Sequence, residues 1–119
     1  MKLTGQQKLV RIFIGEQDRW EGRPLYEAVI DEARSLGMAG ATAFKGFIGF
    51  GCKAHLHTAK LLDLSEDLPI CIELVDTPAK VGTLLPRLDE MIKEGLVTVE
   101  NVEVAIYRAD KSAPRSKRA

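Results

Sequence analysis

Residues suited to bind an anion gather in one short stretch, FKGFIGFGCK, which covers residues 44–53. Glycines carry no Cβ, so their backbone N–H groups can approach a phosphate closely, while lysines add positive charge and phenylalanine rings can stack on a purine. The candidate ligand-binding residues in this stretch are Lys45, Gly46, Phe47, Gly49, Phe50, Gly51 and Lys53. Glycines near the end of a strand more often mark a bulge or a bend, so a purely structural role stays open.

A cysteine and two histidines overlap the end of this stretch, at Cys52, His55 and His57. Histidines two residues apart in an extended segment point to the same side, so these three side chains could begin a transition-metal site. Such sites need three or four ligands with supporting partners, and the chain contains no further histidine. We therefore expect a solvated loop without metal, and we keep a metal-binding trimer built on these residues as the alternative function.

Nucleophilic catalysis is not expected from this sequence. Cys52 with His55 or His57 comes nearest to a Cys/His pair. A nucleophilic site also needs a rigid scaffold and a set of oxyanion donors, which mobile segments rarely provide. We expect no enzyme and no catalytic residues. Cys52 and Cys71 are both expected to be free thiols, because disulfides are rare in cytosolic proteins.

Other polar residues lie where they could act on a ligand or only on the fold. Asp76 and Thr77 precede an expected helix and could orient a ligand at its N-terminus, although a helix cap is the favoured interpretation. Glu73 belongs to an apolar run that predicts a central strand, where a buried carboxylate needs a partner, and Arg11 is the natural candidate. Trp20 is expected to anchor a helix against the sheet.

The elements that must position these residues follow from the hydrophobic pattern. Alternating or continuous apolar runs predict strands over residues 8–15, 41–50, 68–76 and 96–108. Apolar residues at helical spacing predict amphipathic helices over residues 24–37 and 77–95. The order βαββαβ indicates an α+β fold of the ferredoxin-like type, a sandwich with one antiparallel sheet and two helices on one of its faces.

The face of the sheet that the helices leave open is expected to be covered by another copy of the chain. Arg11 and Phe13 on the first strand and Phe44 on the second form a mixed surface that is too apolar to stay wet. A homo-oligomer formed through the sheet faces is therefore expected. This argument does not by itself distinguish a trimer from another oligomer.

Length and charge exclude several classes of protein. The 119 residues suffice for one domain, expected over residues 1–108, and the basic tail over residues 109–119 is expected to be disordered. Lys+Arg and Asp+Glu number 17 each, so no excess positive charge indicates nucleic-acid binding. No apolar run approaches the roughly 20 residues that span a bilayer, so we expect no direct membrane insertion. A cytoplasmic location is expected because no secretory signal is seen.

Three motifs, GEQDRW, GATAFKG and LPICIELVD, give the chain a family resemblance. Over about residues 6–108 it resembles the uncharacterised PII-like family known as domain of unknown function 190, which is related to the nitrogen regulatory protein PII. The resemblance implies a ferredoxin-like protomer and a homotrimer of the PII type. It also implies a mobile segment after the second strand, at about residues 51–66, that corresponds to the PII T-loop.

The resemblance also implies a function. PII-like proteins are signalling proteins that bind adenine nucleotides between protomers, and the nucleotide sets the conformation of a loop that docks on transporters or enzymes. We therefore expect a regulator that binds AMP, ADP, ATP, cyclic AMP or a similar small anion, with a membrane transporter or channel as a possible partner. A structural oligomer without a ligand is the remaining alternative.

Overall fold

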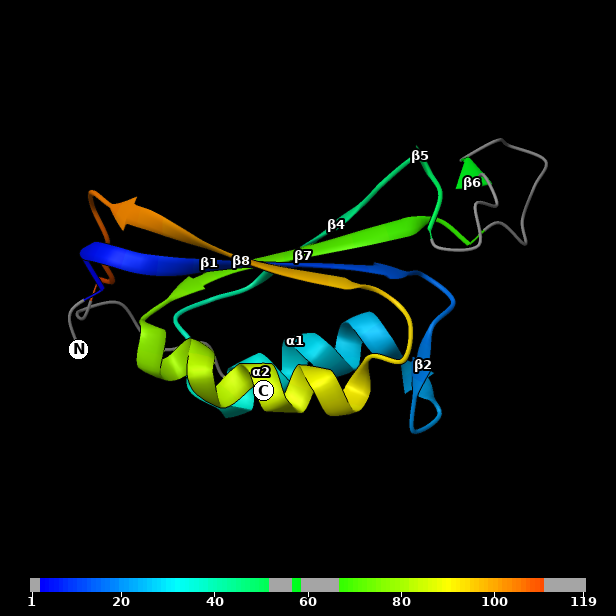
Figure 1. The fold of residues 1–119 in the computed structure, drawn as a ribbon, viewed down its shortest axis with the longest axis horizontal. Coiled ribbons are helices and arrows are strands. Elements are labelled where there is room, and N and C mark those ends of the chain that lie inside the picture. The colour runs from blue at the N-terminus through cyan, green and yellow to red at the C-terminus, as the bar shows by residue number, and fades with distance from the viewer. Residues whose placement is uncertain (1–2, 52–56, 59–66, 111–119) are drawn as a thin grey trace.

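The computed structural model describes residues 3–51 and 67–110, together with the backbone of residues 57–58. Its main layer is a four-stranded antiparallel sheet with the strand order β4-β7-β1-β8. These strands are β1 (Gly5–Gly15), β4 (Thr42–Lys45), β7 (Pro69–Asp76) and β8 (Leu96–Val104). The helices α1 (Leu25–Ser35) and α2 (Pro78–Met91) lie side by side on one face of this sheet (Figure 1). The predicted βαββαβ order and the ferredoxin-like α+β fold are confirmed.

The core lies between the sheet and the two helices. Along β1, Val10, Ile12 and Ile14 are buried and alternate with residues that face the open side of the sheet, as the sequence predicts. The helices contribute their apolar stripes to the same cluster, from Leu25 on α1 to Met91 on α2. The open side of the sheet has no helix over it among the residues that the structure describes (Figure 1).

The helix ends follow the local sequence. Thr77 caps α2 by accepting a hydrogen bond from the Lys80 N–H at 3.2 Å, and Gly37 after α1 takes the left-handed conformation with φ of 75°. The second helix stops at Met91, earlier than the predicted residue 95, because Ile92 already has an extended backbone. Neither described helix is long and apolar enough to cross a membrane.

The strand predicted over residues 41–50 is wrong in its second half. Strand β4 ends at Lys45, and a separate short strand, β5 (Ile48–Gly49), pairs with β6 (His57–Thr58) beyond the end of the main sheet (Figure 1). The chain leaves the sheet at Gly46, which packs directly against the ring of Pro69. The glycines therefore mark a break in the strand, which is the structural alternative that the sequence left open.

Two other boundaries differ from the predictions. The stretch before α1, expected to be a loop, contains a small hairpin of β2 (Arg19–Trp20) and β3 (Arg23–Pro24), and its Trp20 packs against the core as predicted. Strand β8 ends at Val104 instead of residue 108. Its partner in the ladder is Gly5, the first residue of β1, so the segment after Val104 has no strand beside it in the described protomer.

Two predicted segments fall mainly outside the described residues. Of the expected mobile segment over residues 51–66, the structure describes Gly51 and the backbone of residues 57–58. Of the expected tail over residues 109–119, it describes residues 109 and 110.

Candidate functional site

The glycine-bearing strand end is built on close packing against Pro69. The Gly46 N–H donates to the Pro69 carbonyl oxygen at 2.7 Å. A Cβ added at Gly46 would lie 2.8 Å from the Pro69 Cγ, and one added at Gly49 would lie 3.0 Å from the same atom. Gly51, in contrast, has open space around it. Gly46 thus packs too closely for a Cβ, Gly49 is only tightly packed, and the Gly46 N–H is already occupied within the protomer.

The aromatic side chains of this segment are presented to solvent. Phe47 is 74% exposed and Phe50 is 70% exposed, and Ile48 between them is also exposed. Side chains of this size and exposure in one short segment are typical of a surface that binds a partner or a ligand. The structure therefore brings the predicted residues from Lys45 to Gly51 together at one end of the sheet, while Lys53 lies outside the described residues.

The turn that follows β1 holds both ends of the connection between β4 and β7. On the β4 side, the Lys45 Nζ pairs with the Glu16 Oε2 at 2.7 Å. On the β7 side, the Glu16 N–H donates to the Leu68 carbonyl oxygen at 2.8 Å and the Gln17 N–H donates to the Asp67 Oδ1 at 2.7 Å. Lys45 is therefore neutralised by Glu16 in the protomer, and an anion that binds Lys45 must compete with this carboxylate.

Gly15 packs closely against Asp67 in the same turn. A Cβ added there would lie 2.7 Å from the Asp67 Oδ2, and the Gly15 N–H donates to the Asp18 Oδ2 at 2.9 Å. The sequence alone indicates no role for Glu16 or Asp67. The only signal for Glu16 was its place in the motif GEQDRW, and the sequence carries no indication that this motif meets the residues before β7.

The second group of predicted ligand-binding residues lies at the other end of the sheet. Asp76 is fully buried, and its carboxylate accepts the Ala39 N–H and the Thr77 N–H, both at 2.7 Å. These contacts support the helix-cap interpretation, and a ligand role for this pair stays a prediction. Strand β7 separates Asp76 from Pro69 by seven residue steps of about 3.3 Å, or roughly 23 Å. The two groups do not form one site within a protomer (Figure 1).

The open face of the sheet carries a cluster of charges around Arg11. Its Nε donates to the Glu73 Oε2 at 2.9 Å, which confirms the predicted partner, and its Nη1 lies 2.5 Å from the Glu100 Oε1. The expected burial of Glu73 is wrong, because its side chain is 37% exposed on the open face. The hydrogen bond to Glu73 raises the pKa of Arg11. Next to this cluster, burial raises the pKa of the Cys71 thiol, and the negative charge of Glu73 raises it further.

Apolar side chains surround these charges on the open face. Phe13 is 41% exposed and Phe44 is 51% exposed, and both stand opposite Cys71 in the ladders on either side of β7. Leu96 on β8, also exposed, stands opposite Phe13. The predicted mixed surface on the open face is therefore present in the protomer.

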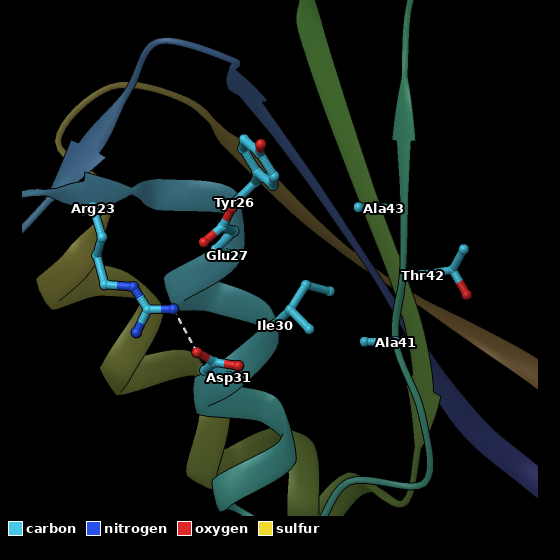
Figure 2. A pocket seen from close by; sticks show the side chains of 8 residues that line it. All are labelled: Arg23, Tyr26, Glu27, Ile30, Asp31, Ala41, Thr42 and Ala43. Carbon is cyan, nitrogen blue, oxygen red and sulfur yellow. Dashed lines mark hydrogen bonds and ion pairs between the residues drawn. The ribbon is translucent and has the colours of Figure 1, made fainter. Parts of the chain in front are cut away.

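A hollow between α1 and β4, of about 450 Å³, was not predicted (Figure 2). Tyr26 and Ile30 from α1 and the small side chains of Ala41 and Ala43 line it. Glu27 and the ion pair between the Arg23 Nη2 and the Asp31 Oδ2, at 2.5 Å, also belong to its lining, and the hydrogen bond from Arg23 lowers the pKa of Asp31. Small residues at an edge strand give no periodic signal, so the sequence alone does not reveal this hollow.

The alternative metal site cannot be placed. Cys52, His55 and the side chain of His57 lie outside the described residues. Within the described ranges, no three His, Cys, Asp or Glu side chains gather in an arrangement suited to a metal ion.

Comparisons with known proteins match nearly the whole described chain. The model of the DUF190 family, described as an uncharacterized ACR, matches residues 7–104. A UPF0166 protein of Aquifex aeolicus is 34% identical over 99 residues, which cover 83% of this chain and 93% of that protein. A UPF0166 protein of Methanocaldococcus jannaschii is 33% identical over 98 residues, with coverage of 82% and 90%.

Solved structures share the same fold. CPII, a nitrogen regulatory PII-like protein from Thiomonas intermedia, was solved bound to ADP, AMP and bicarbonate. It matches 88% of this chain and 100% of its own with a TM-score of 0.64 and 20% sequence identity. At that identity the likeness establishes the fold.

Proposed function

Because this chain belongs to the PII-like DUF190 family, we propose that it is a homotrimeric regulator that binds an adenine nucleotide or a similar small anion between its protomers. Binding would favour one state of the connection between β4 and β7, and that state would dock on a transporter or an enzyme. The coupling requires only that the ligand has different affinities for the two states.

The observation that carries this proposal is the open face of the sheet. Phe13 and Phe44 leave much of their apolar surface in water in the protomer, next to the ion pairs of Arg11. A second copy packed on this face would bury the rings and shield the charges from water. Such packing creates crevices between copies, where small ligands often bind.

Two features support a nucleotide at such a crevice. Over 88% of its length this chain shares the fold of CPII, a protein that was solved bound to ADP and AMP. The strand end that follows β4 offers Lys45 for a phosphate and the exposed rings of Phe47 and Phe50 for a purine. The same exposed rings would supply the apolar surface for docking on a partner when they are not covered by a ligand.

Titration calorimetry with AMP, ADP, ATP and cyclic AMP, combined with analytical ultracentrifugation, tests this function. We expect a trimer at micromolar concentration and saturable heat with at least one of the four nucleotides. If the protein is a trimer but none of the four nucleotides gives heat, nucleotide binding is ruled out. A structural oligomer then remains, or the metal-binding trimer if native mass spectrometry shows bound zinc or copper. A lone protomer at that concentration would contradict the whole proposal.

A substitution of Lys45 tests where the ligand binds. Lys45→Gln is expected to weaken nucleotide binding by about tenfold, because one charge-assisted hydrogen bond to a phosphate is lost. Lys8→Gln is the matched control, since it removes the same charge near the opposite end of the sheet, where the Lys8 Nζ bonds to Asn101. Equal affinities of the two variants would place the ligand elsewhere.

A further inference from the structure

Three carboxylates gather at the turn that joins β1 to β2, at the end of the sheet where β7 begins (Figure 1). Glu16 and Asp18 belong to the turn itself, and Asp67 lies two residues before the start of β7. The Asp18 Oδ2 accepts the Gly15 N–H at 2.9 Å. The Asp67 Oδ1 accepts the Gln17 N–H at 2.7 Å. These two carboxylates cannot turn away without losing a hydrogen bond.

Glu16 is the carboxylate of the turn whose charge is neutralised by a cation. Its Oε2 pairs with the Lys45 Nζ at 2.7 Å, and its side chain is only 24% exposed. In the described part of the chain, no other lysine or arginine pairs with any of the three carboxylates. The turn therefore depends on Lys45 to offset its negative charge.

Asp67 lies against the backbone on both sides of Glu16. Its carboxylate approaches Gly15 so closely that a Cβ added there would lie 2.7 Å from the Oδ2. Its Oδ1 is bonded to the N–H of Gln17, the residue that follows Glu16. Two negative charges in such close quarters repel each other unless a cation offsets one of them. In the protomer, Lys45 is that cation.

We propose that Glu16 and Asp67 transmit the binding of an anion from Lys45 to the start of β7. An anion that takes Lys45 leaves Glu16 without its cation and adds negative charge beside the turn. The repulsion between Glu16 and Asp67 then weakens the hydrogen bond from the Gln17 N–H, and Asp67 leaves the turn. The inference rests on the proposed function, because it supplies a contact through which a ligand at Lys45 favours one state of the connection between β4 and β7.

Backbone contacts next to Asp67 limit how far this change extends. Leu68 is buried, and its carbonyl oxygen accepts the Glu16 N–H at 2.8 Å. Strand β7 starts at the next residue and pairs with β1 from there on. These contacts join neutral backbone groups, so they do not depend on the charge of Lys45. The change should therefore stop at Leu68 and leave the sheet intact.

Lys45→Gln tests the transmission without any ligand, because it removes the cation and leaves Glu16 unpaired. Nuclear magnetic resonance of the Gln17 amide is the measurement, since hydrogen exchange reports local opening of its bond to Asp67. We expect this amide to exchange about threefold faster, the effect of losing one ion pair that is partly exposed. The Glu16 amide, which is bonded to the buried Leu68, is the internal reference and should change less.

Added substitutions separate the charge from the shape of the contact. Glu16→Gln in the Lys45→Gln background leaves no unpaired carboxylate at this position, so protection of the Gln17 amide should return. Asp67→Asn in the same background keeps an oxygen acceptor but removes the charge, and should also restore protection. Asp89→Asn, on the exposed surface of α2, is the matched control and should not. An unchanged Gln17 amide in Lys45→Gln, or equal rescue by the control, would overturn the inference.

Nucleotides then connect the inference to the proposed function. In the unaltered chain, a nucleotide that gives heat in calorimetry should speed exchange of the Gln17 amide, as Lys45→Gln does. In the Asp67→Asn chain the same nucleotide should still bind while the Gln17 amide stays protected. Binding that leaves this amide unchanged in the unaltered chain would overturn the inference, and the proposed function would stand. If none of the four nucleotides binds, the proposed function fails, and the result for Lys45→Gln alone decides whether Glu16 and Asp67 are coupled by charge.

Discussion

The thiol of Cys71 lies at the centre of the open face, opposite Phe13 on one side and Phe44 on the other. Burial in the protomer is the largest cause that raises its pKa, and the carboxylate of Glu73 is the second, while Arg11 opposes them. The neutral thiol is therefore favoured in the folded state. Because a raised pKa means that the folded state holds the proton more tightly, this stabilising contribution is complete below the pKa of the unfolded thiol. It is lost as the pH rises through the pKa of the folded one.

We predict that Cys71 reacts with iodoacetamide only at higher pH than an unfolded thiol. The measurement is the alkylation rate against pH in a Cys52→Ser background, with the same chain in urea as the control. The midpoint of the profile reports the pKa, while the plateau reports access. Adding Glu73→Gln should move the midpoint down, since it removes one cause of the raised pKa. A midpoint equal to that of the unfolded chain would contradict the prediction.

The contacts of single residues could be predicted from the sequence where both partners lie on paired strands of the sheet. Arg11 and Glu73 carry opposite charges and stand opposite each other in adjacent strands, so side-chain alternation and charge sufficed to pair them. Lys45 and Glu16 also form an ion pair, but one lies on a strand and the other in a turn. No periodicity relates those two positions, so this pair required the structure.

At the scale of elements, the break after β4 depends on one close contact. We predict that Gly46→Ala lowers the free energy of unfolding by about 1–3 kcal/mol, because the added Cβ would lie 2.8 Å from the Pro69 Cγ. Gly51→Ala should have little effect, since nothing lies within 4 Å of a Cβ there. Urea unfolding at a fixed protomer concentration measures both. Pro69→Ala should relieve much of the cost of Gly46→Ala, and a cost that persists in this double variant would disprove the contact.

The long periodic elements were predictable, and the short ones were not. The apolar alternation of β1 and the helical spacing of α1 and α2 are signals that extend over many residues. The two-residue strands β2 and β5 are too short to carry a period, and each depends on a partner across a turn. The candidate site follows the same rule. The residues of the strand end were predicted from their types, but the ion pair between Lys45 and Glu16 was not.

At the scale of the whole molecule, assembly should protect the apolar surface that the protomer exposes. The rings of Phe13 and Phe44 flank β7 on the open face, close to the carboxylate of Glu73. A new negative charge in this place would have to lose its hydration at the proposed interface and would also be repelled by Glu73. Solvent can hydrate the same charge freely in a lone protomer.

We therefore predict that Phe44→Glu shifts the protein towards the protomer without unfolding it. Phe44 is 51% exposed in the protomer, so the fold should tolerate the substitution, while the association constant should fall by at least about a hundredfold. Thr83→Glu, on the exposed surface of α2, adds the same charge as a control. Sedimentation velocity gives the oligomeric state, and circular dichroism checks the fold. Because the proposed ligand site lies between copies, nucleotide binding should disappear with assembly, and a folded Phe44→Glu protomer that still binds nucleotide would place the site within one chain.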